Sequence, residues 1–295
     1  MVNSMKRIVV FGGSGFVGSH VADQLSDAGH NVVIYDICTS PFLRHDQEMV
    51  VGDLLDLESV SETIKGASAV YNFAALSDLN EALSKPISTI NINILGNCNV
   101  LEGCRLHSVN RFVYASSVYV NSREGGFYGC SKKASEQFIE EYYRSYGLDY
   151  TILRYGSLYG PRADSRNGLQ RIVMEAIKNK VLNYEGDEAA SREYIHVRDA
   201  AVASVKSLDE KFKNKKIILT GHQPIRVVDL LSMLAEIMGL PKSSVKFSQS
   251  EYEGHYIRTP YHYESDLAQK YIPETYIDLG EGLLELITEY DKTKE

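Results

Sequence analysis

Short apolar runs alternate with longer amphipathic segments through the first half of the chain. Runs of β-branched and aromatic residues predict buried strands at 7–12, 31–36, 69–75 and 111–117. Segments of helical periodicity lie between them, at 16–28, 56–65, 87–107 and 131–146. Alternation of this kind predicts right-handed βαβ units and an α/β fold with a parallel, doubly wound sheet of the Rossmann type.

The pattern continues less regularly toward the carboxyl end. One more strand is predicted over 149–160, where the Gly160–Pro161 pair ends it. Beyond it we expect helices at 168–179, 198–209, 226–238 and 279–290, and short strands near 181–184, 193–196, 216–219 and 244–247. Several of these elements return to the first sheet in chain order, and no clean linker separates them. We therefore predict a doubly wound domain over 1–160 and a smaller, interleaved α/β lobe over 161–295.

Three glycines with the spacing G-x-x-G-x-x-G follow the first predicted strand and open the first predicted helix: Gly12, Gly15 and Gly18. Small residues suit this place because the turn is tight, the backbone must approach a pyrophosphate, and the helix packs closely on the strand. The helix N-terminus adds amide donors and partial positive charge. A glycine-rich turn without a ligand is the alternative, but the strand–turn–helix setting favours a dinucleotide site.

Two aspartates follow later strands of the same predicted sheet. Asp36 ends the second strand, about twenty residues beyond the glycines, where a carboxylate can accept both ribose hydroxyls and would repel a 2′-phosphate. This favours NAD over NADP, although Asp36 could instead cap the next loop. Asp53 follows the expected third strand and could either accept from the adenine amino group or cap a helix.

Composition narrows the range of partners and settings. The net charge of -8 and the pI of about 5.6 argue against nucleic acid or an acidic membrane as the main partner. The four cysteines (Cys38, Cys98, Cys104 and Cys130) form no C-x-x-C pair and no metal-ligand spacing, so we expect no metal site. The N-terminal residues resemble no signal peptide, and no stretch approaches about 18 apolar residues. We expect a soluble, cytoplasmic protein.

A candidate for proton transfer lies in "YGCSK", where Tyr128 and Lys132 are four residues apart and share one face of a helix. A phenol has a pKa near 10, which is too high for a base at neutral pH. An ammonium one turn away, together with the charge of an oxidised nicotinamide, favours the phenolate. A solvated pair on a helix surface has the same local sequence, so the pair alone decides nothing.

Eight motifs, taken in order, support a comparison with a known family. They are "GGSGFVG" (12–18), "GDLLD" (52–56), "NFAAL" (72–76), "NINILGNCNVLEGC" (91–104), "YASS" (114–117), "YGCSK" (128–132), "LRYGSLYGPR" (153–162) and "REYIHVRDAA" (192–201). The chain resembles the extended short-chain dehydrogenase/reductases, the nucleotide-sugar epimerase/dehydratase family, along nearly its whole length.

This resemblance implies a hydride-transfer site made of Ser117, Tyr128 and Lys132. Phenolate Tyr128 would take the hydroxyl proton of a secondary alcohol as the carbon delivers hydride to the nicotinamide, and Lys132 would also bind the nicotinamide ribose. Ser117 would hydrogen-bond the same alcohol oxygen. Ser117 is preferred to Ser116 because it matches the second residue of the family's pair, and strand alternation points only one of them into the site.

The same resemblance assigns the cofactor contacts. Asn93 matches an asparagine that lies beneath the active-site helices and is more architectural than chemical. The full set of expected cofactor-binding residues is Gly12, Gly15, Phe16, Val17, Gly18, Asp36, Asp53, Leu54, Ala74, Ala75, Asn93, Tyr128, Lys132 and Tyr155.

Departures from the family pattern narrow the reaction. Relatives that eliminate water carry an Asp-Glu pair after the residue matching Ser117, where this chain has Val118 and Tyr119. Neither can do carboxylate acid/base work near neutral pH, which argues against a 4,6-dehydratase. Relatives that epimerise beside the ketone have a cysteine just after the serine, but Cys130 lies elsewhere, inside the Y-x-x-x-K turn. Chemistry at C4 remains, as 4-epimerisation or as net oxidation or reduction.

Substrate recognition departs from the family pattern as well. The stretch between Ser117 and Tyr128 is shorter than the usual substrate loop, and Ser157 replaces an asparagine that contacts the diphosphate in many relatives. Arg192 matches an arginine that reaches the diphosphate, and Arg258 lies where a second is expected; guanidinium geometry suits paired phosphate oxygens. Either arginine could instead form a surface ion pair. His196, by contrast, is expected to be a packed strand residue.

Three functions are compatible with the fold expected here. The first is an NAD-dependent epimerase or dehydrogenase acting at C4 of a nucleotide-diphosphate sugar. The second is a non-catalytic NAD-sensing protein of the same fold, against which the intact Ser117, Tyr128 and Lys132 argue. The third is a reductase of a small carbonyl compound, which the two arginines and Asp36 disfavour. Family analogy also predicts a homodimer formed through the helices at 91–107 and 131–146.

Overall fold

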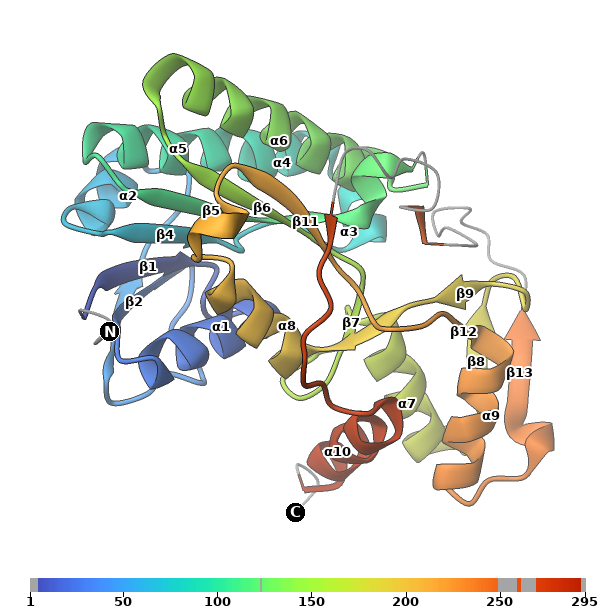
Figure 1. Ribbon diagram of the computed structural model, residues 1–295. Helices are drawn as coiled ribbons and strands as arrows, with labels where there is room; N and C mark the ends of the chain where they lie inside the picture. Colours follow the sequence, from blue (N-terminus) through green and yellow to red (C-terminus); the bar gives the residue numbers. More distant parts are fainter. Residues whose placement is uncertain (1–4, 123, 249–258, 261–268, 293–295) are drawn as a thin grey trace.

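The computed structural model describes residues 5–122, 124–248, 259–260 and 269–292 of the 295-residue chain. Its centre is an eight-stranded sheet of order β14-β11-β6-β5-β4-β1-β2-β3, in which every neighbouring pair is parallel (Figure 1). The strands are β1 (Arg7–Phe11), β2 (Asn31–Asp36), β3 (Gln47–Val51), β4 (Ala69–Asn72), β5 (Arg111–Ser117), β6 (Tyr150–Tyr155), β11 (Lys215–Leu219) and β14 (Gln269–Lys270). The predicted doubly wound parallel sheet is confirmed.

Helices cover both faces of this sheet (Figure 1). On one face lie α1 (Phe16–Asp27) and α8 (Val197–Lys206), which pack on each other. On the other lie α2 (Leu57–Ile64), α5 (Asn97–Leu106) and α6 (Gly126–Tyr146). The alternation of β1 explains both layers: Ile8 and Val10 enter the core beneath α1 and α8, whereas Val9 and Phe11 enter the core beneath α2 and α5.

The segment predicted as one helix over 87–107 has three parts. It consists of α4 (Pro86–Ile90), a π-helical stretch η1 (Asn91–Gly96) and α5, and it is preceded by a short helix, α3 (Leu79–Ser84). Within η1, Asn93 is buried and hydrogen-bonds the backbone of Leu76 and the hydroxyl of Ser131. Side-chain bonds of this kind to distant parts of the chain accompany the local change of helical period.

The single strand predicted over 149–160 is wrong, because two strands occupy that range. β6 belongs to the main sheet, whereas β7 (Ser157–Tyr159) pairs in parallel with β10 (Tyr194–His196) in a separate two-stranded sheet. Gly156 separates them, and a Cβ there would lie 2.7 Å from Thr220 Cγ2. The chain therefore leaves the main sheet at a position where a larger side chain has no room.

The remaining elements build a smaller lobe with its own core. Its helices and strands are α7 (Gly168–Asn179), β8 (Leu182–Glu185), β9 (Ser191–Arg192), β12 (Ile225–Arg226), α9 (Val227–Ile237), β13 (Val245–Ser248) and α10 (Leu279–Lys292). Leu169, Val173, Leu230, Leu234 and Leu283 pack together in this core. Three elements that follow residue 161 return to the main sheet: β11 and β14 are strands of it, and α8 packs on the helix layer beside α1. The two parts of the chain are therefore interleaved (Figure 1).

Candidate active site

The glycine-rich turn between β1 and α1 is built from backbone contacts that exclude side chains. Gly12 has φ of +73°, and a Cβ there would lie 2.4 Å from the backbone nitrogen of Ala74. A Cβ on Gly18 would lie 2.2 Å from the carbonyl oxygen of Gly12. Both positions require glycine, because the turn, the helix and the end of β4 meet without room for a methyl group.

The first turn of α1 has the features of an anion site. Gly15 is the N-cap and offers no side-chain cap, and the first turn, which includes Phe16 and Val17, carries no acidic residue. The first amides of a helix have no intrahelical acceptor, and the helix dipole favours a negative ligand at this end. The turn therefore fits the diphosphate of a dinucleotide.

Asp36 lies beside this turn and ties it to the next strand. Its Oδ2 accepts from the amide of Ser14 at 2.9 Å, and its Oδ1 accepts from the amide of Ile37 at 2.8 Å. The Ser14 hydroxyl donates to the carbonyl of Cys38 at 3.0 Å. A carboxylate held here fits a ribose with two free hydroxyls, which agrees with NAD as the cofactor.

Of the other residues expected to contact the cofactor, some lie at the edge of the sheet next to the glycine turn and others make contacts within the protein. Ala74 and Ala75 follow β4 at the carboxyl edge of the sheet, next to the glycine turn. Asp53 Oδ1 accepts from the amide of Leu55, so its carboxylate caps its own turn. Leu54 is buried and packs against Gly96.

Two of the residues expected to bind the cofactor are buried and hydrogen-bond other side chains of the protein. Asn93 Nδ2 donates to the Ser131 hydroxyl on α6 at 2.9 Å. Tyr155 lies in the core, where its hydroxyl hydrogen-bonds the Ser204 hydroxyl at 2.6 Å. Its phenol is therefore engaged within the protein.

Ser117, Tyr128 and Lys132 meet at the carboxyl end of β5. Lys132 is buried on α6; its Nζ donates to the carbonyl of Ala115 at 2.7 Å and lies 4.7 Å from the centre of the Tyr114 ring and 5.8 Å from that of Tyr128. Ser117 Oγ accepts from the amide of Tyr119 at 3.3 Å. Because α6 begins at Gly126, Tyr128 and Lys132 occupy its first turns and face the strand end.

Burial shifts the proton affinities of this pair in opposite directions. It raises the pKa of Tyr128 to about 12, an effect that a hydrogen bond with Ser117 reduces. It lowers the pKa of Lys132 to about 7, and the carboxylate of Glu136 opposes that decrease. Opposed shifts on a neighbouring acid and base are typical of sites that transfer protons.

Sequence reasoning missed a buried ion pair directly behind these residues. The carboxylate of Glu136 accepts two hydrogen bonds from the Arg154 guanidinium, Nε to Oε1 at 3.0 Å and Nη2 to Oε2 at 2.7 Å. Ser116 donates to Glu136 Oε1 at 2.5 Å. The side chains of Glu136 and Arg154 are only 3% and 4% exposed. The available signals were the charged Arg154 within an apolar strand and the acidic residue one turn beyond Lys132.

Two residues expected to bind the substrate diphosphate lie in or near the second lobe. Ser157 begins β7, and Arg192 on β9 is buried and donates to the Tyr184 hydroxyl at 3.0 Å. Arg258 lies outside the described residues. His196 is fully buried against the Tyr159 ring, and burial lowers its pKa to about 4, as suits a packed strand residue.

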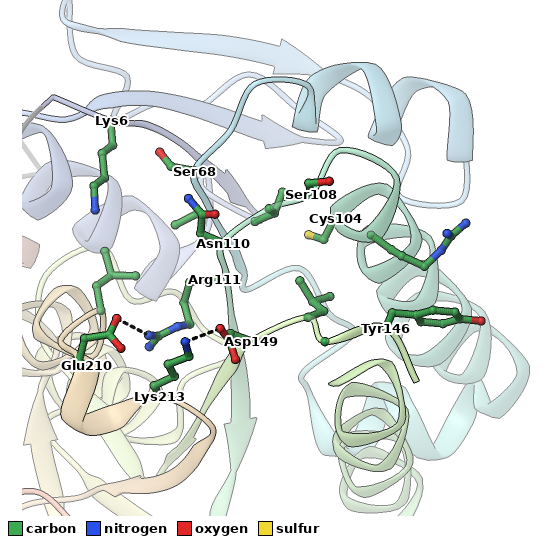
Figure 2. A pocket seen from close by; sticks show the side chains of 16 residues that line it. Lys6, Ser68, Cys104, Ser108, Asn110, Arg111, Tyr146, Asp149, Glu210 and Lys213 are labelled. Atoms are coloured by element: carbon green, nitrogen blue, oxygen red, sulfur yellow. Dashed lines mark hydrogen bonds and ion pairs between the residues drawn. The ribbon is translucent and has the colours of Figure 1, made fainter. Parts of the chain in front are cut away.

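A cavity of about 450 Å³ lies at the opposite, amino edge of the sheet (Figure 2). Its charged groups include two ion pairs, Arg111 with Glu210 at 3.4 Å and Lys213 with Asp149 at 2.6 Å, drawn as dashed lines in Figure 2. None of Ser117, Tyr128 and Lys132 lines it. Ligands of open parallel sheets bind at the carboxyl ends of the strands, so we place the chemistry at that edge.

Two features are absent from the described part of the chain. No group of three or more His, Cys, Asp or Glu side chains is arranged to hold a metal ion there. No described helix is both long enough and apolar enough to cross a bilayer.

The fold and this site together define an NAD-dependent oxidoreductase with a Tyr–Lys pair. The profile of the NAD dependent epimerase/dehydratase family matches residues 8–221. A putative UDP-glucose 4-epimerase of Methanocaldococcus jannaschii is 29% identical over 302 residues, covering 95% of this chain and 97% of that protein. The UDP-glucose 4-epimerase of Mus musculus is 30% identical over 283 residues, covering 77% of this chain and 82% of that protein.

A solved structure agrees with these sequence matches. The UDP-glucose 4-epimerase of Thermus thermophilus, in complex with NAD, superposes with a TM-score of 0.82 at 25% identity, covering 97% of this chain and 99% of that one. The chain belongs to the NAD dependent epimerase/dehydratase family, and it is an enzyme of the extended short-chain dehydrogenase/reductase type whose cofactor is NAD.

Cofactor choice gives a first test of the Asp36 geometry. Asp36→Asn keeps the shape of the side chain but removes its charge, so we expect NAD affinity to fall about 10- to 100-fold, the loss of a hydrogen bond to a charged group. Discrimination against NADP should decrease, because the like-charge repulsion is gone. Titration calorimetry with both nucleotides measures this. Glu48→Gln, an exposed acid on the adjacent strand β3, should leave both affinities unchanged.

Proposed function

We propose that this enzyme is a UDP-sugar 4-epimerase that works through a transient ketone at C4. The observation that carries the proposal is the meeting of Ser117, Tyr128 and Lys132 at the end of β5, with Val118 and Tyr119 rather than a carboxylate pair next in the chain. Two relatives, a putative UDP-glucose 4-epimerase and a UDP-glucose 4-epimerase, support the UDP-sugar class.

Each of the three residues has a distinct task in this proposal. Tyr128 takes the proton from the C4 hydroxyl at its phenolic oxygen and later returns it. Ser117 donates to the same substrate oxygen and fixes its distance from Tyr128. Lys132 favours the phenolate by its charge and binds the nicotinamide ribose. When bound, NAD would supply the hydride-transfer chemistry for oxidation and reduction at C4.

Support for the cofactor end comes from the residues around the glycine turn. We assign Gly12, Gly15 and Gly18, with the amides of Phe16 and Val17, to the diphosphate, and Asp36 to the adenosine ribose. The adenosine and nicotinamide ends of the cofactor would be bordered by Asp53, Leu54, Ala74 and Ala75. Asn93 would support the helices beneath the cofactor. The interior position of Tyr155 leaves it a packing role beside the nicotinamide.

At the substrate end, Ser157, Arg192 and Arg258 are proposed to bind the diphosphate. Arg192 is buried and donates to the Tyr184 hydroxyl, and the planar guanidinium suits paired phosphate oxygens. The short stretch after Ser117 is shaped by Tyr119, whose ring meets the Tyr128 ring edge-on with centroids 6.3 Å apart. An aromatic side chain in this position would border the sugar.

A net 4-dehydrogenase is the second candidate, because the same residues oxidise C4 if the ketone leaves before hydride returns. The shortened segment between Ser117 and Tyr128 favours that outcome, since less chain covers the site. The small-carbonyl reductase and the NAD-sensing protein stay as weaker alternatives.

A panel of nucleotide sugars distinguishes these functions. The purified protein is incubated with UDP-glucose, UDP-N-acetylglucosamine and UDP-glucuronic acid, with GDP and dTDP sugars as controls, while NADH absorbance and product stereochemistry are recorded. Inversion at C4 without net redox is expected. Stoichiometric NADH with a keto product would mean a dehydrogenase, and turnover of small ketones alone would overturn the proposal.

We also propose a homodimer formed through α4, η1, α5 and α6. Exposed apolar side chains gather on these helices, which pack on one another, among them Ile87 (67% exposed), Ile90, Leu95 and Phe138 (44% exposed). Phe138→Glu should shift the protein to a monomer in sedimentation equilibrium, because it places a charge in the interface. Leu284→Glu, at an exposed position of α10 away from these helices, should not. We further propose a cytoplasmic, reducing setting, in which the four cysteines would remain free thiols.

A further inference from the structure

Behind the candidate catalytic residues lies one buried acidic side chain, Glu136, that none of the proposed steps uses. Glu136 lies on α6 one turn beyond Lys132, so the two share a helix face. Ser116, the immediate neighbour of Ser117 on β5, donates to its carboxylate at 2.5 Å. Arg154 on β6 donates to both of its oxygens.

We infer that Glu136, clamped by Arg154, is a positioning residue that locks α6 to the end of β5 and so places a carboxylate one helical turn from the Lys132 ammonium. The inference concerns how the site of the proposed function is assembled, and it goes beyond the roles assigned to Ser117, Tyr128 and Lys132. Glu136 itself touches none of the groups expected to react.

The Glu136–Arg154 ion pair connects several segments around the site. The paired hydrogen bonds from Arg154 fix the plane of the Glu136 carboxylate, since a guanidinium and a carboxylate match in a fork geometry. The Arg154 Nη1 also donates to Asn121 Oδ1 at 3.2 Å, so the segment that follows Ser117 is tied to the same guanidinium. One ion pair thus joins α6, β5, β6 and the segment Val118–Asn121.

The electrostatic environment of Lys132 is set by the titratable and aromatic groups that face it. From α6 it faces Tyr128 and Glu136, and from β5 it faces the Tyr114 ring. Cys98 on α5 lies beyond Tyr114, and burial raises its pKa, which favours the neutral thiol. Glu136, whose carboxylate is ion-paired with Arg154, is the acidic side chain in this set, and it opposes the effect of burial, which lowers the pKa of Lys132.

Removing the charge of Glu136 removes the force that opposes deprotonation, so the pKa of Lys132 decreases and its ammonium is lost at a lower pH. The alkaline limb of the activity profile should then move to lower pH. A purely structural role would lower the melting temperature and leave that limb in place.

Glu136→Gln tests this, because it keeps the size of the side chain and removes its charge. We expect the Lys132 titration, followed by NMR on protein with ¹³C-labelled lysine, to move down by about one pH unit. With the substrate found by the panel, kcat should fall up to about 10²-fold at alkaline pH, as for other misplacements of a catalytic group, with KM little changed. Glu136→Asp, which keeps the charge, should restore the titration.

A matched control lies one turn further along α6. Glu140 is bound to Lys216 at 2.9 Å, and the same Lys216 lies 3.8 Å from Glu136. Glu140→Gln should leave the Lys132 titration unchanged. If Glu136→Gln fails to fold, the double variant Glu136→Gln with Arg154→Met removes both charges together, and a downward shift smaller than that of the single variant is expected, because the loss of the Arg154 cation partly offsets it.

The NMR titration needs no substrate, so a silent panel of sugars would count against the proposed function alone. An unchanged Lys132 titration in a folded Glu136→Gln protein would overturn this inference, whatever the sugar panel shows.

Discussion

Tyr128→Phe is expected to lower kcat by about 10²- to 10⁴-fold, the range typical of losing a general acid–base group. Phenylalanine keeps the ring that meets Tyr119 edge-on, so packing is preserved and only the phenolic oxygen is lost. Burial holds the pKa of Tyr128 at about 12, well above neutral, which means that the remaining groups of the site must stabilise its phenolate during catalysis. Initial-rate kinetics with the identified UDP-sugar provide the measurement.

Tyr146→Phe is the matched control. It lies on the same helix, is 61% exposed and stands far from the end of β5, so its turnover should equal that of the wild-type enzyme. NAD binding and the melting temperature of Tyr128→Phe should remain close to wild type. A Tyr128→Phe enzyme that keeps more than about a tenth of the wild-type kcat would exclude Tyr128 as the base.

Lys132→Met is expected to lower kcat by about 10²- to 10³-fold, as when a preorganised electrostatic donor is removed. At the same time it should raise the stability of the NAD-free protein below about pH 7. Burial lowers the pKa of Lys132 from 10.5 to about 7, so between these values the folded protein binds fewer protons than the unfolded chain.

The sign of this stability effect can be measured. The cost of burying the ammonium is full below about pH 7 and fades as the pH rises toward 10.5. Methionine has nearly the same length and no charge to bury, so the variant should melt higher than wild type near pH 6, and the difference should shrink at alkaline pH. Thermal melts across that range provide the test.

Lys133→Met controls for the loss of a lysine from this helix. Lys133 is the next residue and is exposed, so neither turnover nor the pH dependence of stability should change. If Lys132→Met melted lower than wild type at every pH, the buried ammonium would be stabilising the fold instead of being held there for the chemistry.

The sequence by itself determined the features that depend on neighbours in the chain. The apolar runs at 7–12 and 31–36 became β1 and β2, because a short β-branched run buried on both faces is stable as a central parallel strand. Gly12 and Gly18 could be read as a tight strand–turn–helix, since the steric need for glycine is set by the local backbone. These short-range constraints established the fold class, and the motifs read in order indicated the family and the cofactor.

Only the tertiary structure decided the features that join distant segments. The split of 149–160 at Gly156 depends on the pairing of β7 with β10, nearly 40 residues later, which local sequence does not record. The interruption of 87–107 by a π-helical stretch accompanies the bonds that Asn93 makes to Leu76 and Ser131.

The ion pair behind the site is the clearest case. Glu136 and Arg154 are 18 residues apart and lie on a helix and a strand that each look ordinary in the sequence. A charged residue becomes informative when burial removes it from water, because its charge must then be paired, and burial is a property of the folded packing. Tyr128 and Lys132 could be found from their spacing along one helix, whereas the groups that set their charge state could be found only in three dimensions.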